Sequence, residues 1–367
     1  MSLSESFSML RPHIDEATTT ALASLLTRVG TTQRSTNFAE AVVASTSGGK
    51  RFRALMAHVG WSLTSGLPLT QASLPHLSAA LELYQASALV HDDIIDHADE
   101  RRGAPTPHRR LADHHVSSAW IGSPTDFGDH AAILVGDFLF SAAVNAADEQ
   151  ALALRGDSVR AFTRRFADMH AEVALGQYLD IVAEQTPLDP ERTDALNTCD
   201  SLEVALHKSA RYSVVHPAVL GAICGAASLS EALGLIEVLE RILTPWGLAF
   251  QLRDDDLGVF GDPALTGKPA GDDLREGKRT ALLALTWEAS SPTERRALTD
   301  VLGVAEASAE QIEEAKQIVE RNGLAAHEAE IARLVRDGRE ALETSGIDAD
   351  AAIMLQELCD ILTARRA

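Results

Sequence analysis

A stripe of apolar residues that runs into a cluster of acids constrains the fold of this chain more than any other feature. The stripe consists of Leu77, Leu81, Tyr84 and Ala88, at intervals of four, three and four residues, and Asp92 lies four residues further on. Residues at these spacings share one face of an α-helix. The pattern therefore predicts a buried helix whose acidic end needs a cation or another buried partner.

The rest of the sequence favours long helices joined by short loops. Hydrophobic residues make up 46% of the 367 residues but aromatic residues only 5%, and recurring Ala and Leu suit close helix packing. Gly and Pro mark five predicted loops, Gly66–Thr70, Gly103–Pro107, Gly122–Asp129, Thr186–Pro190 and Gly261–Asp273. Residues 293–367 have the pattern of amphipathic helices. Because no repeat or shift of composition is present, we predict an all-α, single-domain large helical bundle over residues 1–367.

Charge and targeting signals restrict the partners of the chain. Its formal net charge of -21 argues against nucleic acid, because phosphate backbones attract surplus Lys and Arg. The longest apolar stretch, Ala131–Val144, contains Asp137 and is shorter than the roughly twenty residues of a membrane span. The N-terminal segment has no basic start or long apolar run, and the three cysteines are widely spaced. We therefore expect a cytoplasmic protein with reduced thiols and no membrane span.

The first acidic cluster is the segment His91–Gly103, HDDIIDHADERRG. Asp92 and Asp96 are four residues apart, so they project from neighbouring turns of one helical face and can hold a divalent cation together. Magnesium is the expected ion, because it prefers oxygen ligands and usually binds through one or two carboxylates plus substrate phosphates. A solvated acidic helix face is the alternative, but the apolar stripe places Asp92 at the end of a buried face.

Two further segments combine acids, glycines and cations. The second acidic cluster, QLRDDD, ends an apolar run and contains Gln251, Asp254, Asp255 and Asp256. The cations that follow it are Lys268, Lys278 and Arg279. A diphosphate held through metal ions needs both signs of charge. The segment GGKRFR, Gly48–Arg53, supplies cations without a neighbouring acid, which suits a second diphosphate bound without metal. Taken alone, this segment would be only a loop before a basic helix start.

These segments, in this order, resemble the family of trans-isoprenyl diphosphate synthases, the polyprenyl synthetases. The matching segments lie between about residues 48 and 279 and are GGKRFR, HDDIID with RRG, GQYLD (Gly176–Asp180), LHKSARY (Leu206–Tyr212) and QLRDDD with GKPAGDD. The resemblance implies an isoprenoid synthase bundle with a central active-site cavity, and a homodimer. It also implies condensation of isopentenyl diphosphate with allylic diphosphates (dimethylallyl, geranyl or farnesyl), assisted by several Mg²⁺ ions.

The resemblance implies a role for each matching residue. The implied metal ligands are Asp92, Asp93, Asp96, Asp254 and Asp255. The implied ligands of isopentenyl diphosphate are Lys50, Arg53 and Arg102, and those of the allylic diphosphate are Arg101, Lys208 and Lys268. Further implied substrate contacts are Gln177, Ser209, Gln251 and Lys278. The residues on which catalysis would depend most are Asp92, Asp96, Lys208, Gln251, Asp254 and Lys268. For Gln177 and Lys208, an ordinary polar helix residue and a snorkelling surface lysine are the alternative interpretations.

Two positions depart from the family pattern. Gln85 stands where a His usually precedes the first acidic motif, so an uncharged donor would serve the isopentenyl diphosphate site and change its affinity. Gly258 stands where the second motif usually ends in Asp, so only Asp254 and Asp255 match, and Asp256 is an extra acid. We interpret the Gly form as variation, not as loss of activity.

Product length is predicted from positions on the same helix as the first acidic cluster. A chain growing away from Asp92 passes Ala88 and Ser87, both small, before it meets Tyr84. Eight residues at a rise of about 1.5 Å place Tyr84 roughly 12 Å from Asp92, which is room for a few isoprene units. We therefore predict geranylgeranyl diphosphate as the product, with farnesyl diphosphate as the near alternative.

Two other functions compete with this interpretation. A class I terpene cyclase also uses DDxxD and magnesium, but QLRDDD lacks the Asn/Ser/Glu motif expected there, and the GGKRFR segment implies a second diphosphate. A non-catalytic regulatory subunit of a hetero-oligomeric synthase is favoured by Gln85 and Gly258. The retained acids and lysines argue against such a subunit.

Overall fold

The computed structural model describes residues 2–261, 271–304 and 306–364 and confirms the all-α class. Clustering of the chain gives two compact units, Met1–Phe166 with Pro217–Ala232, and Ala167–His216 with Leu233–Ala367. Three helices have residues in both units: α7 (Asp157–Gln185), α9 (His216–Gly225) and α10 (Leu229–Phe260). The single domain expected from the sequence stays a prediction.

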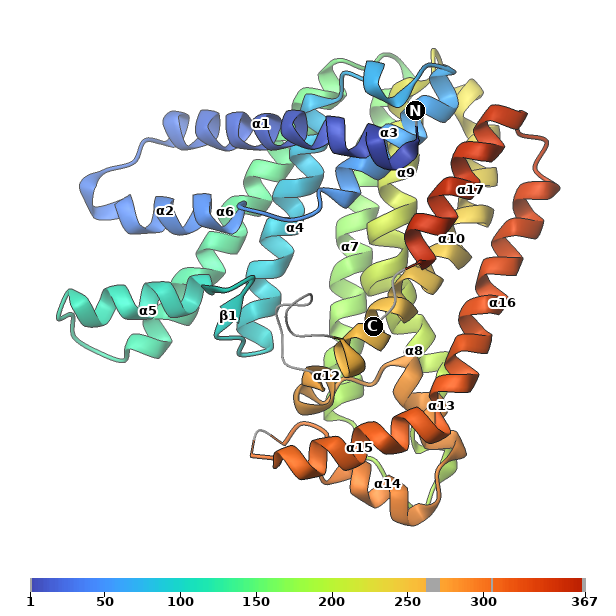
Figure 1. Ribbon diagram of the computed structural model, residues 1–367. Coiled ribbons are helices and arrows are strands. Elements are labelled where there is room, and N and C mark those ends of the chain that lie inside the picture. Colours follow the sequence, from blue (N-terminus) through green and yellow to red (C-terminus); the bar gives the residue numbers. More distant parts are fainter. Residues whose placement is uncertain (1, 262–270, 305, 365–367) are drawn as a thin grey trace. The chain divides into compact units, whose positions relative to one another are not determined.

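The first unit is built around α4 and α6, which pack along each other (Figure 1). Its helices are α1 (Leu3–Val29), α2 (Thr36–Ser45), α3 (Phe52–Ser65), α4 (Pro75–Ile95), α5 (Pro107–Ser117) and α6 (Pro124–Leu152), with short 3-10 helices at Gln33–Ser35 and Leu69–Gln71. A two-stranded antiparallel ribbon, β1 (Glu100–Arg101) with β2 (Ala104–Pro105), follows α4. Its second strand lies in the segment predicted as the Gly103–Pro107 loop.

The predicted stripe forms a buried face of α4. The helix begins at Pro75, whose fixed φ suits the first helical position, and ends at Ile95, directly before Asp96. Leu77 and Leu81 are fully buried, and Tyr84 is 6% exposed. The helix and its burial are therefore confirmed, and the first acidic cluster lies at the C-terminal end of α4. Because that end carries the negative pole of the helix dipole, the position favours a bound cation.

Helix α6 is the one helix among the described residues that is long and apolar enough to cross a membrane by length and composition. Its most apolar 18-residue window has a mean hydropathy of 1.4 and is 44% buried. Core helices of soluble proteins meet the same criteria. One face of α6 packs against α4: the Ser87 hydroxyl donates to the Gly136 carbonyl at 2.8 Å, and the Leu77 amide donates to the Gln150 side chain at 3.3 Å.

The start of α6 differs from the sequence prediction of a loop over Gly122–Asp129. The helix begins at Pro124, so most of that segment is helical. Ser123 is its N-cap, and the Ser123 hydroxyl accepts a hydrogen bond from the Asp126 amide at 3.2 Å. Gly and Pro here mark a helix start instead of a long loop.

The second unit contains most of α7 and α10 and the C-terminal helices. Its other elements are a 3-10 helix (Thr193–Ala195), α8 (Thr198–Ala205), a π-helix (Leu206–Val215), α12 (Asp272–Glu276), α13 (Ala281–Ala289), α14 (Pro292–Thr299), α15 (Ala309–Asn322), α16 (Leu324–Glu343) and α17 (Ala349–Thr363). Trp287 of α13 is fully buried, and its indole N–H donates to the Arg192 carbonyl at 3.0 Å.

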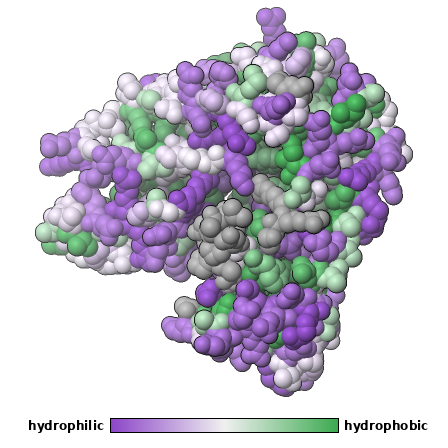
Figure 2. All heavy atoms as spheres, in the orientation of Figure 1, coloured by the Kyte–Doolittle hydropathy of each residue, from purple (hydrophilic) through white to green (hydrophobic). Residues whose placement is uncertain are grey.

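The amphipathic helices predicted over residues 293–367 are confirmed by α14 to α17. In α15, Ile312, Ala315, Ile318 and Val319 face the core, and the glutamates between them are exposed. Figure 2 shows the largely hydrophilic surface over α14 and α15 in the lower part of the view.

Candidate active site

The first acidic cluster lies on the last turns of α4 and faces the ribbon. Nε of Arg101 donates to Oδ1 of Asp93 at 2.6 Å, and an Arg101 NH2 lies 3.4 Å from Oδ2 of Asp92. Burial raises the pKa of Asp93 to about 6 against the opposing effect of Arg101, and the charges of Asp92 and Asp96 raise it further. The cluster thus carries three carboxylates at the end of α4, and this negative charge fits a bound cation.

A basic cluster forms in the same unit around the GGKRFR segment. Arg102 donates from NH1 to the Ser47 carbonyl at 3.0 Å, and its guanidinium covers Gly48 and Gly49. Burial lowers the pKa of Arg102, and the neighbouring charges of Arg101, Arg51 and Arg53 lower it further. The repulsion between these cations would be relieved by a bound anion such as a diphosphate.

Glu82 is a residue of this region that the sequence interpretation missed. It is 6% exposed on α4, where its Oε1 accepts from the Ala54 amide at 3.2 Å and its Oε2 lies 3.5 Å from NH1 of Arg51. Burial raises the pKa of Glu82, and Arg51 and Arg53 oppose that effect. A lone acid in the apolar run LELYQ was the available signal. Gln85 follows Glu82 by one turn of α4 and is half-buried.

The residues predicted to set product length lie where α4 meets α6. The Tyr84 ring packs edge-on against the Phe140 ring of α6, with centroids 6.0 Å apart. The Ser87 hydroxyl bonds to α6, as described above, so it is directed at the Gly136 carbonyl. Ala88 is half-buried. Sequence reasoning missed Phe140, because its contact with Tyr84 spans 56 residues of chain.

The second acidic cluster lies on the last two turns of α10, and two of its acids, Asp255 and Asp256, have different partners. Asp255 is 5% exposed and accepts from Nε2 of Gln251 at 2.9 Å. Burial raises the pKa of Asp255 well above its usual range, and the charges of Asp273, Asp254 and Asp256 add to that shift. Like the first cluster, this one lies at a helix C-terminus and fits a cation.

Asp256, the extra acid, is directed at α16. Its Oδ1 accepts from Nδ1 of the fully buried His327 at 2.9 Å, and its Oδ2 accepts from Arg253 at 3.0 Å. Arg253 also donates to both carboxylate oxygens of Glu328. These contacts give Asp256 a structural role in joining α10 to α16.

Gly258, the second departure from the family pattern, lies against Asp273 of α12. A Cβ atom added at Gly258 would collide with the Asp273 carboxylate. That carboxylate therefore occupies the space that a side chain at position 258 would need. Asp273 also contributes to the raised pKa of Asp255, so it supplies negative charge to this cluster from another segment.

The GQYLD and LHKSARY segments lie together in the second unit. Lys208 forms an ion pair with Asp180 of α7, and Ser209 and Gln177 are half-buried beside that contact. Lys278 pairs with Glu276 at 2.8 Å. Lys268, the remaining predicted diphosphate ligand, lies outside the described residues. The partially buried ion pair of Lys208 does not match the alternative of a snorkelling surface lysine.

The residues of the acidic clusters fit magnesium by their chemistry. They offer carboxylate oxygens, which are the ligands that Mg²⁺ prefers. Within the ranges that the structure describes, no three His, Cys, Asp or Glu side chains are gathered as a preformed cation site.

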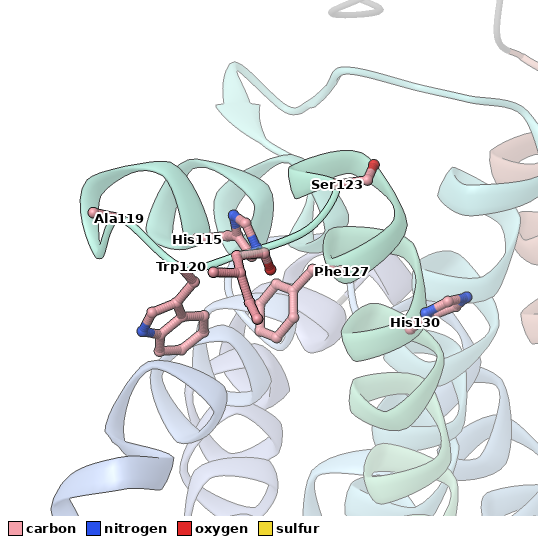
Figure 3. Close-up of a pocket in the computed structure, with 7 residues that line it drawn as sticks. His115, Ala119, Trp120, Ser123, Phe127 and His130 are labelled. Carbon is pink, nitrogen blue, oxygen red and sulfur yellow. The ribbon is translucent and has the colours of Figure 1, made fainter.

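One surface pocket of 530 Å³ lies apart from the predicted site residues, at the turn between α5 and α6 (Figure 3). The Trp120 ring packs edge-on against Phe127, with centroids 5.1 Å apart. His115 also lines the pocket, and its Nε2 lies 3.1 Å from the Ile121 carbonyl oxygen. These contacts show that the aromatic residues and His115 pack against one another within this turn, which gives them a structural role.

Comparison with known proteins relates the whole chain to one family. The family model described as "Polyprenyl synthetase" matches residues 35–319. A geranylfarnesyl diphosphate synthase from Aeropyrum pernix is 31% identical over 87% of this chain and 91% of its own length, and a geranylgeranyl diphosphate synthase from Saccharolobus solfataricus is 30% identical over 76% and 75%. The crystal structure of a geranylgeranyl pyrophosphate synthase from Corynebacterium glutamicum, complexed with isoprenyl diphosphate and magnesium, has a TM-score of 0.83 and 33% identity over 100% of both chains.

Proposed function

Because this chain belongs to the polyprenyl synthetase family of prenyltransferases, we propose that it is a magnesium-dependent short-chain trans-isoprenyl diphosphate synthase. It condenses isopentenyl diphosphate with dimethylallyl, geranyl or farnesyl diphosphate. Its proposed product is geranylgeranyl diphosphate. Farnesyl diphosphate is the second candidate, because Tyr84 and Phe140 place two aromatic rings together beyond the small residues of α4.

The observation that carries this proposal is the position of two neighbouring arginines after α4. Arg101 contacts the acids of the first cluster, whereas Arg102 contacts the loop of the GGKRFR segment. A single ribbon thus joins an acidic site, suited to a metal-bound diphosphate, to a basic site, suited to a diphosphate without metal. A condensation between two substrates that each carry a diphosphate requires such a pair of sites.

The proposed roles follow from these charges. Lys50, Arg53 and Arg102 bind isopentenyl diphosphate beside Gln85. Five carboxylates would hold several Mg²⁺ ions, which would supply charge neutralisation for the allylic diphosphate: Asp92, Asp93, Asp96, Asp254 and Asp255. Arg101, Lys208, Lys268 and Lys278 add direct contacts to that diphosphate. Gln177, Ser209 and Gln251 line the reaction site.

In the proposed reaction these residues bind the substrates and stabilise charge. The C–O bond of the allylic diphosphate breaks, and its electron pair leaves with the diphosphate, where Arg101 and Lys208 stabilise the developing charge. The double bond of isopentenyl diphosphate attacks the allylic cation. A proton is then lost to the released diphosphate, so no side-chain base is required. We further propose a homodimer that works in the cytoplasm.

The experiment that tests this proposal supplies the purified protein with labelled isopentenyl diphosphate and, separately, dimethylallyl, geranyl and farnesyl diphosphates, with and without Mg²⁺. Products are resolved by chain length. Elongation that requires Mg²⁺ and stops at twenty carbons supports the proposal, and a stop at fifteen carbons selects the farnesyl alternative. No elongation with any of these starters would favour the regulatory-subunit interpretation.

Tyr84 provides a test of product length. Replacing Tyr84 with Ala removes one ring of the pair with Phe140, so the product should lengthen by at least one isoprene unit of five carbons. Tyr84→Phe keeps the ring and serves as the matched control, with unchanged product. If Tyr84→Ala gives products of unchanged length, Tyr84 does not limit the chain.

A further inference from the structure

The segment Leu206–Val215, which carries Lys208 and Ser209, is a π-helix ten residues long. Helices of this type are rare, usually extend over a single turn, and are often found at functional sites. A segment of this length therefore needs contacts that favour the π-helix over the more stable α-helix. Those contacts come from α7.

Three residues of α7, spaced four apart, face the π-helix. Gly176 lies at the closest approach, because a Cβ atom there would collide with the backbone of Lys208. One turn later, Asp180 forms the ion pair with Lys208. One turn earlier, Glu172 contacts two side chains within the π-helix and the side chain of the residue directly after it. This face of α7 therefore fixes both the backbone and the side chain of Lys208.

Glu172 binds His207, Arg211 and His216 with one carboxylate. Oε1 accepts from Nδ1 of His207 at 2.8 Å and lies 2.9 Å from Nε of Arg211, and Oε2 accepts from Nε2 of His216 at 2.5 Å. Because an ionised carboxylate only accepts hydrogen bonds, each of these imidazole nitrogens carries a proton. One acid thus contacts the start, the middle and the end of the π-helix.

The spacing of these three partners distinguishes the two helix types. In an α-helix, at about 100° per residue, His216 would point about 180° away from His207. A π-helix has about 4.4 residues per turn, so the steps of four and five residues from His207 to Arg211 and His216 return to nearly the same face. All three side chains can therefore reach Glu172 only while the segment is π-helical.

The electrostatics agree with a strong contact. Burial acts to raise the pKa of Glu172, but the hydrogen bonds from His216 and His207 and the charge of Arg211 outweigh it and lower the pKa to about 2. Close by, burial and the charge of His216 lower the pKa of His170 to about 4. Glu172 is therefore ionised at neutral pH, and its side chain is only 16% exposed.

We propose that Glu172 is a positioning residue that holds Leu206–Val215 as a π-helix and thereby places Lys208 and Ser209 for the allylic diphosphate. A change to α-helix would rotate Lys208 by more than a right angle relative to His216. Lys208 would then lose its close backbone contact with Gly176 and its ion pair with Asp180. The substrate part of this inference rests on the proposed function. The structural part, that Glu172 maintains the π-helix, does not.

The test compares Glu172→Gln with Glu330→Gln, the matched control. Glu330 of α16 has a similar exposure of 18% and also binds an arginine, Arg333, but does not contact the π-helix. The first measurement is amide hydrogen exchange over residues 206–216. We expect at least about tenfold faster exchange there in Glu172→Gln and no change in the control.

The second measurement separates the two substrates. In Glu172→Gln the KM for the allylic diphosphate should rise about tenfold or more, while the KM for isopentenyl diphosphate changes less than about twofold. Equal rises for both substrates, or unchanged exchange over residues 206–216, would overturn the inference. If the unmodified protein elongates no starter, the proposed function fails, and the exchange measurement still decides the structural part.

His207→Ala keeps the inference testable if Glu172→Gln does not fold. It removes one of the three partners of Glu172, so the same selective changes should occur. The logarithm of each fold-change should be about a third to a half of its value for Glu172→Gln. A His207→Ala variant with normal exchange and normal KM values would also overturn the inference.

Discussion

The two acidic clusters have similar sequences but use their acids differently. At the end of α4, Arg101 contacts both Asp92 and Asp93, so a single cation is shared within one local segment. At the end of α10, Asp255 bonds to Gln251, whereas Asp256 bonds to α16. The difference teaches that neighbouring acids of one cluster can have different partners, because the helical face on which each acid lies decides what it meets.

The largest expected effect separates Asp92 from Asp256. Asp92→Asn should lower kcat by about 10²- to 10³-fold, because it removes a proposed ligand of the Mg²⁺ ions that would stabilise the charge developing on the diphosphate. Asp256→Asn should leave kcat within about threefold but lower the free energy of unfolding by about 1–3 kcal/mol, because its buried bonds to His327 and Arg253 weaken. Steady-state kinetics and urea unfolding measure the two effects. A similar loss of kcat in both variants would mean that Asp256 also belongs to the metal site.

A smaller effect concerns the pH dependence of the first cluster without a cation. The pKa of Asp93 is raised from 3.8 to about 6, so the folded protein binds this proton more tightly than the unfolded chain. The resulting contribution to stability is present below about pH 4 and is lost as pH rises through about 6. In EDTA-treated protein, the free energy of unfolding of the parent should fall as pH rises from 4 to 7. For Asp93→Asn this fall should be smaller by about 2 kcal/mol. Thermal unfolding between pH 4 and pH 7 measures it, and parallel curves for variant and parent would contradict the assigned pKa.

The smallest expected effect concerns the Gly258 departure in the second cluster. Gly258→Asp restores the usual motif in sequence but would collide with Asp273, so Mg²⁺ affinity should fall about tenfold. Gly258→Asp combined with Asp273→Ser exchanges the two carboxylates and should recover most of the affinity. Calorimetric titration with Mg²⁺ and inorganic pyrophosphate provides the measurement. Tighter binding by the single variant would show that Asp273 does not fill the place of the missing acid.

Sequence reasoning succeeded where the signal was local. The stripe from Leu77 to Asp92 predicted α4 and the end at which its acids lie. The family resemblance implied that Arg102 and the GGKRFR segment serve one diphosphate; Arg102 lies against this segment in the structure, and its role stays a prediction. It failed at Gly122–Asp129, where Gly and Pro were interpreted as a loop although Ser123 and Pro124 begin α6.

The partners of single side chains were not predictable in the same way. Glu82, Phe140 and Asp273 were missed, because each acquires its role from a residue on another segment. No sequence pattern distinguishes Asp256, which bonds to α16, from the equally buried Asp255 beside it, which bonds to Gln251. The π-helix was also missed, because its residues fit an α-helix equally well until Glu172 is placed beside them.

The sequence by itself therefore determined the helical class, the face of α4 and the chemistry available at the ends of α4 and α10. These properties depend on residues within a few turns of one another, and helical periodicity records them directly. Only the tertiary structure decided which acid meets which cation, and in which helical form Lys208 is presented. Such choices depend on contacts between segments far apart in the chain, where burial and competing partners set the energy of each charged group.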